Sequence, residues 1–163
     1  MRMASATLSL GKSQAERAIW WAGLIAGTLD LTAAFVSAGL RGRGPVQILH
    51  SIASGLLGAA SFRGGFATAA LGAALHFVIA FGAAAVYYAA SRQIKLLVRQ
   101  AVVCGLIYGV AVYAFMNLVV LPLSAISFKP AYPPAALVTG LIIHMLCVGL
   151  PIALVVRRFS HRF

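Results

Sequence analysis

The sequence predicts an all-α integral membrane protein, a four-helix bundle with one short additional helix. Three observations predict this fold. The chain of 163 residues is 62% hydrophobic and 9% charged, with a mean hydropathy of +0.98, whereas a soluble domain carries about 25% charged residues. Four apolar stretches are long enough to cross a bilayer, which takes about 20 residues. The 13 Lys and Arg residues lie in short clusters between these stretches.

The four predicted spans follow one another along a single membrane domain, residues 1–163. They cover residues 19–40, 66–90, 100–122 and 135–156. The second and third spans are joined by a short connection, as are the third and fourth, and short connections make neighbouring helices antiparallel. We therefore expect all four to pack as one bundle.

The connection between the first two spans contains an amphipathic segment, residues 45–58. Pro45 suits the first position of a helix. At about 14 residues the segment is too short to cross a bilayer, so we expect a helix that lies in the outer interface or re-enters the membrane part-way. Its apolar residues recur at the spacing of one helix face, and they are Leu49, Ile52, Ala53, Leu56 and Leu57.

The distribution of cations predicts that both termini are cytoplasmic, in a multi-pass protein of the bacterial inner membrane. Cytoplasmic connections of membrane proteins carry an excess of Lys and Arg. With the N-terminus inside, nine cations lie on the cytoplasmic side: Arg2, Lys12, Arg17, Arg92, Lys95, Arg99, Arg157, Arg158 and Arg162. Four lie outside: Arg41, Arg43, Arg63 and Lys129. The net charge of +11 therefore reflects membrane orientation. It does not predict nucleic-acid binding, which needs cations on one face with interleaved aromatic residues.

An acidic residue near the middle of the first span is the strongest functional signal. Asp30 is one of only two acids in the chain, and an ionisable residue at the centre of a membrane helix costs about 2.5–3.5 kcal/mol. His76 and His144 occupy similar depths in the second and fourth spans, roughly 15 Å below the outer end at 1.5 Å per residue. Asn117 lies higher in the third span. We expect these residues to form one polar layer.

The face on which Asp30 lies predicts that this layer points inward. Asp30 shares a helix face with Gly27 and Ala34, and small residues mark the faces along which membrane helices approach one another. The other spans have similar stripes of small residues around their polar side chains.

Three functions remain open for the polar layer. First, Asp30 and a histidine form a buried pair that fixes helix register, in a structural, assembly or accessory subunit of a larger membrane complex. Second, the layer serves a proton-coupled small transporter or a channel, because Asp and His chains in membranes relay protons and histidine changes charge near neutral pH. Asp30 would accept the proton, His76 and His144 would pass it on, and His50 of the outer segment would form the entry. With four spans, a channel would need a homo-oligomer.

The third function is binding of a metal or of haem. Two histidines and one aspartate form a plausible set of ligands for Zn²⁺ or Fe²⁺, here His76, His144 and Asp30. Two facing histidines can alternatively bind haem between the helices of a bundle. The motifs of soluble enzymes, such as a P-loop or a GxSxG elbow, do not occur, so the sequence does not favour an enzyme. The lipid bilayer is the one partner that it predicts directly.

Several short motifs carry a resemblance to a family of proteins. The chain resembles an uncharacterised family of small four-helix bacterial inner-membrane proteins. The resemblance implies an all-helical fold in a bacterial inner membrane and no particular activity. The motifs are Gly55-Leu56-Leu57-Gly58, Leu75-His76-Phe77, Met116-Asn117 with Pro122-Leu123-Ser124, and His144-Met145 with Gly149-Leu150-Pro151.

Overall fold

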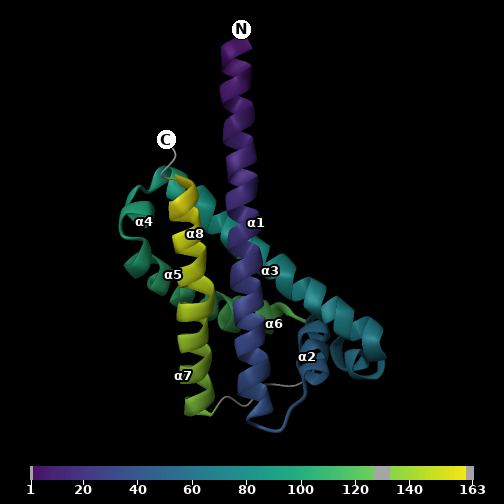
Figure 1. Cartoon of the computed structure of the whole chain (residues 1–163). Helices are drawn as coiled ribbons and strands as arrows, with labels where there is room; N and C mark the ends of the chain where they lie inside the picture. The colour runs from purple at the N-terminus through teal and green to yellow at the C-terminus, as the bar shows by residue number, and fades with distance from the viewer. Residues whose placement is uncertain (1, 127–132, 161–163) are drawn as a thin grey trace.

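A computed structural model shows the architecture of the chain (Figure 1). The structure describes residues 2–126 and 133–160, with side chains from residue 14 onward, and the described residues form helices and short connections. The elements in chain order are α1 (Arg2–Gly39), α2 (Pro45–Leu57), η1 (Gly58–Arg63), α3 (Gly65–Gln93), α4 (Leu96–Arg99), α5 (Ala101–Phe115), η2 (Met116–Val120), α6 (Leu121–Leu123), α7 (Pro134–Ile143), η3 (His144–Gly149) and α8 (Leu150–Ser160).

Four helical segments are long and apolar enough to cross a membrane, which confirms the predicted all-α membrane bundle. They are Gln14–Gly39 in α1, Gly65–Gln93 in α3, Ala101–Leu123 from α5 to α6, and Pro134–Ser160 from α7 to α8. Each matches a predicted span to within a few residues. The chain is therefore a multi-pass membrane protein.

Two segments outside these spans differ from the prediction. Helix α1 begins at Arg2, so the polar residues before the first span continue its helix and extend past the rest of the bundle (Figure 1). The amphipathic segment forms α2, as predicted, with Pro45 in its first turn. A 3₁₀-helix, η1, follows α2 directly and was not predicted. The predicted outer loop between the third and fourth spans lies mostly outside the described residues.

The third and fourth spans each contain a π-helical turn. In η2 the amide of Leu121 donates a hydrogen bond to the carbonyl of Met116, five residues back. In η3 the amide of Leu150 donates to Met145 in the same way. A proline, Pro122 or Pro151, is the second residue after each turn. Proline lacks an N–H and its ring collides with the carbonyl four residues earlier, and the wider π turn relieves that collision.

One half of the bundle is packed tightly around small side chains. Its core lies where α3 ends, α5 begins and α8 ends, which is also the end from which the N-terminal part of α1 projects (Figure 1). The Tyr87 hydroxyl donates a 3.0 Å hydrogen bond to the carbonyl of Leu97 and fixes α4 to α3. This half of the bundle is therefore closed. The fully buried residues of the core are Ala22, Ala26, Ala84, Tyr87, Ala101, Ile152, Ala153 and Val156.

Glycine allows α5 to contact η3 along the backbone. A side-chain carbon on Gly109 would collide with the backbone of His144 and Met145. On the facing helix, Gly149 lies against the backbone of Gly105 and Gly109. Small residues bring membrane helices this close because no side chain separates their backbones. The contact fixes the position of His144 relative to α5.

Candidate functional site

The Asp30 and His144 side chains meet in the middle of the bundle. The His144 Nδ1 atom lies 3.9 Å from the Asp30 Oδ1 atom, and the two side chains are 21% and 17% exposed respectively. This distance exceeds that of a hydrogen bond, 2.7–3.2 Å, so the interaction is an electrostatic pair. Asp30 comes from the last third of α1, and His144 begins η3. The structure thus brings together two of the predicted polar residues from the first and fourth spans.

His76 joins the same region from α3. Its Nε2 atom is 2.9 Å from the carbonyl oxygen of Gly27, one turn before Asp30 on α1. The ring lies edge-on to Phe77, with centroids 5.5 Å apart. This hydrogen bond connects α1 to α3, so the polar layer joins three of the four spans.

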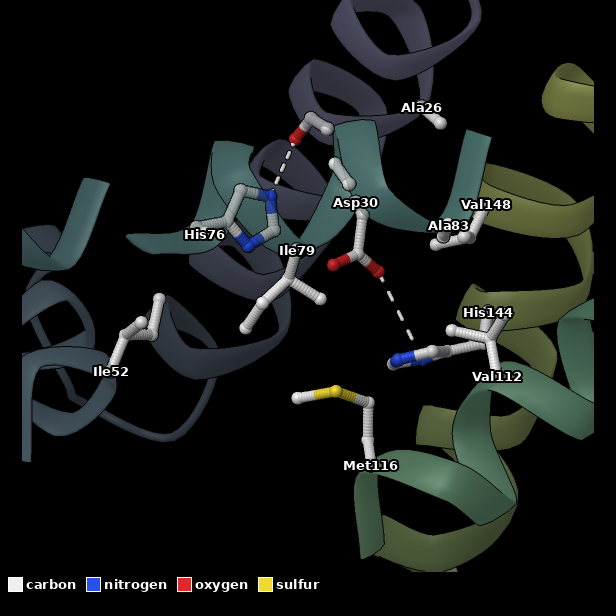
Figure 2. Close-up of a pocket in the computed structure, with 12 residues that line it drawn as sticks. Ala26, Asp30, Ile52, His76, Ile79, Ala83, Val112, Met116, His144 and Val148 are labelled. Atoms are coloured by element: carbon white, nitrogen blue, oxygen red, sulfur yellow. Dashed lines mark hydrogen bonds and ion pairs between the residues drawn. The ribbon is translucent and has the colours of Figure 1, made fainter. Parts of the chain in front are cut away.

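These three polar side chains line one cavity of about 100 Å³ (Figure 2). A water molecule needs about 10–15 Å³ of such space, so the cavity has room for several waters or for one small ligand. Apart from the polar groups its wall is apolar, and Met116 of η2 forms one side. The other residues in the wall are Ala26, Gly27, Ile52, Ile79, Ala80, Ala83, Val112 and Val148.

Backbone carbonyls determine which ring nitrogens carry hydrogen. A carbonyl oxygen only accepts, so the nitrogen that faces it must donate. His76 donates from Nε2 to Gly27, and His144 donates from Nδ1 to the carbonyl of Gly140 at 2.9 Å. In the neutral rings, Nδ1 of His76 and Nε2 of His144 are therefore acceptors. Figure 2 shows the second nitrogen of His76 turned away from Gly27.

The polar groups of the cavity thus share one property: each offers a lone pair. The Asp30 carboxylate has acceptors only, and each neutral histidine has its donor occupied by a carbonyl. Such a set favours a ligand that brings hydrogen and positive charge. The titratable groups next to the cavity are Cys147 of η3, which interacts electrostatically with Asp30, and Tyr113 of α5, whose ring is 5.2 Å from that of His144.

Two other predicted residues lie apart from the cavity. His50 is 9% exposed, and its Nε2 atom is 2.8 Å from the carbonyl of Gly65, so it fastens α2 to the start of α3. Asn117 donates from its side chain to the carbonyl of Tyr113, four residues back in its own helix, at 2.8 Å. Neither residue lines the cavity. The structure therefore groups Asp30, His76 and His144 without His50 or Asn117.

The geometry does not suit the predicted metal and haem sites. Among the described residues, no three His, Cys, Asp or Glu side chains lie close enough together to hold a metal ion. His76 and His144 each use one ring nitrogen on a carbonyl, which is compatible with ligation by the other, but the two do not share a ligand set with Asp30. Sites for large organic ligands occupy about 300–1,000 Å³, so a cavity of about 100 Å³ does not fit haem.

The sequence did not lead us to predict the two π turns of the site. The π turn η3 begins at His144, and η2 begins at Met116, so both residues at this edge of the cavity start a widened turn. Such turns are frequent at functional sites. Pro122 and Pro151 inside apolar spans are the sequence signal that could have indicated them.

The fold and the cavity define a class: an all-α, multi-pass membrane protein with a polar cavity between its spans. Compared with protein families, curated proteins and solved structures, the chain shows no match. The resemblance to small bacterial inner-membrane proteins therefore stays a prediction, and function has to be argued from the cavity itself.

Proposed function

We propose that this protein is a proton-coupled small transporter in which a proton and a small organic cation bind alternately at Asp30, His76 and His144. The observation that carries the proposal is that all three groups line one cavity, and that each neutral histidine, with one nitrogen donating to a carbonyl, has its other nitrogen as an acceptor. A ligand with several N–H donors and a positive charge complements this set, as guanidinium and ammonium groups do.

The need for charge balance supports alternate binding. An uncompensated carboxylate in the membrane core is costly. One proton shared by Asp30 and His144 neutralises the pair, and so does one bound cation beside neutral His144. A proton and a cation together would leave excess positive charge. The cavity therefore favours one or the other, which is the condition for exchange.

The closed half of the bundle supports exchange over free conduction. The core around Tyr87 and Ile152 is fully buried, so it separates the cavity from the end of the bundle where α8 ends. An aqueous pore would need an open path through this core. By contrast, a carrier that exposes its binding site to one side of the membrane at a time needs a closed barrier such as this core.

Proton release on cation binding tests the proposal. The full chain in lipid nanodiscs, in weakly buffered solution near neutral pH with an indicator dye, should release about one proton per protein when guanidinium chloride is added at millimolar concentration. Guanidinium keeps its charge at this pH, so the released proton comes from the protein. Sodium chloride at equal ionic strength is the control. If guanidinium releases no protons, or no more protons than sodium does, the proposal is wrong.

A second candidate is a structural or accessory subunit, favoured by the way the same residues link the helices. His76 ties α3 to α1, and Asp30 with His144 ties α1 to η3. Buried polar pairs can fix helix register without any activity. In that case the protein would act within a homo-oligomer or a larger membrane complex, and loss of Asp30 would lower stability or assembly without any cation-dependent signal.

Orientation in the bacterial inner membrane is part of the proposal. The N-terminal part of α1, the α3–α5 connection and the end of α8 lie at the same end of the bundle (Figure 1), and among the described residues these segments contain eight of the 13 cations. The positive-inside tendency therefore supports cytoplasmic termini. A reporter active only in the cytoplasm should be active when fused after Phe163 and inactive in the connection at Gly42. The reverse pattern would overturn this orientation.

A further inference from the structure

A long apolar groove runs between α3 and α5, beside the polar cavity. It has a volume of about 510 Å³. Val86 is 61% exposed and Phe115 58%, so the groove opens on the outer surface of the bundle, which faces lipid in a membrane. At one end the Tyr108 hydroxyl donates a 2.7 Å hydrogen bond to the carbonyl of Ala83 and joins the two helices. The remaining residues of the groove are Ile79, Gly82, Ala111, Val112, Met116 and Val120.

The groove and the polar cavity share part of their walls. Ile79 and Ala83 of α3, Val112 of α5 and Met116 of η2 line both. A molecule that lies in the groove can therefore reach the cavity with one end past these four side chains. The groove is apolar along its length, whereas the cavity ends on Asp30 and the two histidines.

We propose that the ligand is a cationic amphiphile, with an N–H-bearing cationic head in the Asp30 cavity and an alkyl body in the groove between α3 and α5. This inference rests on the proposed function and names its substrate class. Charge complementarity selects the head: Asp30 is the one acid at the site, and each histidine keeps one ring nitrogen free of the hydrogen bond that the other makes to a carbonyl. Apolar complementarity selects the body.

The route of entry follows from the same geometry. The ligand reaches the cavity sideways from the bilayer through the opening beside Val86 and Phe115, because the closed core separates the cavity from the end of the bundle where α8 ends. The acyl chains of ordinary lipids can occupy the groove, but a lipid without a cationic head supplies no charge to replace the proton that Asp30 and His144 share. A cationic amphiphile therefore displaces them.

A chain-length series tests the proposal. Ethylguanidinium, butylguanidinium and hexylguanidinium carry the same head, and their binding to the full chain in nanodiscs is measured by proton release against free aqueous concentration. Each buried methylene contributes up to about fourfold in affinity. We expect the half-saturating concentration to fall at least tenfold from the ethyl to the hexyl compound. Hexanol, which has the same chain and no charge, should release no protons.

A substitution that fills the groove separates binding there from general partition into lipid. Gly82 lines the groove, and a first side-chain carbon there meets no atom within 4 Å, so we expect the ring of Gly82→Phe to occupy the groove. This variant should reduce the gain in affinity from ethylguanidinium to hexylguanidinium to less than about threefold. Gly39→Phe is the matched control, because Gly39 also has open space around it and lies at the end of α1. That variant should keep the full gain.

The outcomes distinguish failure of the inference from failure of the proposed function. If the gain with chain length is absent, or is equally large in Gly82→Phe, the groove does not hold the alkyl body and the inference is wrong. The proposed function survives that result provided that guanidinium itself still releases protons. If neither guanidinium nor hexylguanidinium releases protons, both are wrong.

Discussion

Replacing Asp30 with asparagine is expected to abolish the proton release that guanidinium drives from the wild-type protein. Asparagine keeps the size of the side chain and removes its charge. The chain has only two acids, and Asp30 is the one that lines the cavity. Losing a charge-assisted partner costs about 1.5–3 kcal/mol, so guanidinium affinity should fall roughly ten- to a hundredfold. Isothermal calorimetry and the indicator dye measure the two effects separately.

Glu16→Gln is the matched control for this variant. Glu16 is the other acid, lies on the same helix and is exposed near the polar end of the α1 span. Its removal changes the net charge by the same amount without touching the cavity, and proton release should persist. If Asp30→Asn still releases protons on cation binding, Asp30 has no part in the exchange. If no cation signal exists and Asp30→Asn mainly lowers the thermal midpoint, the structural candidate is favoured.

The same site predicts how cation affinity depends on pH. Proton and cation compete, so linkage requires that a rise in pH strengthens cation binding. While the site holds one proton, the apparent dissociation constant should fall about tenfold per pH unit. The groups that take part are Asp30, His144 and His76, with Cys147 and Tyr113 adjacent. In Asp30→Asn the affinity that remains should lose most of this dependence.

Much of the fold could be predicted because the bilayer limits what a sequence can do. A stretch as apolar as the one around Val138 has few alternatives to a membrane helix, and Pro45 marks the start of α2. The spacing that put Asp30 on a face with Gly27 also indicated its inward direction. Periodicity along one helix thus carries information about that helix and the side on which it packs.

The details of the site depend on features that periodicity does not report. His50, on the amphipathic outer segment, was predicted to form the entry of a proton relay, yet it bonds to Gly65 outside the cavity. Asn117 bonds back to its own helix. The widened turn that begins at His144 precedes Pro151, a proline inside the predicted fourth span. The angles at which the helices cross, together with these local irregularities, decide which polar residues meet. The depth of each residue within the membrane matters less.

The groove illustrates the same limit on a larger scale. The second and third spans are consecutive and joined by the short α4, which predicts close antiparallel packing. The structure instead leaves about 510 Å³ between α3 and α5. Helix α5 has its closest contact with η3, where Gly105, Gly109 and Gly149 meet, and this contact draws it away from α3. The sequence indicated that these glycines mark a helix contact, but it did not predict which helix each would contact.

Replacing Gly109 with leucine is expected to destabilise the bundle by about 3 kcal/mol or more, the upper end of the cost of overfilling a packed interface. The added side chain would meet the backbone of His144 and Met145, and backbone atoms cannot turn aside as a flexible side chain can. Helix α5 and η3 must separate, which also moves His144 from Asp30. Gly109→Ala should show a smaller loss in the same direction.

The effect is measured as the free energy of unfolding in mixed detergent micelles, with Gly82→Leu as the matched control. Both substitutions add the same side chain to a glycine inside a membrane span, but Gly82 has no atom within 4 Å of the added carbon. Replacing glycine inside a helix also removes a helix penalty of about 1 kcal/mol, so Gly82→Leu should be neutral or stabilising. Equal stability of the two variants would show that α5 and η3 do not meet along their backbones, and the position assigned to His144 would then be wrong. A loss confined to Gly109→Leu would instead tie the geometry of the Asp30–His144 pair to this glycine contact.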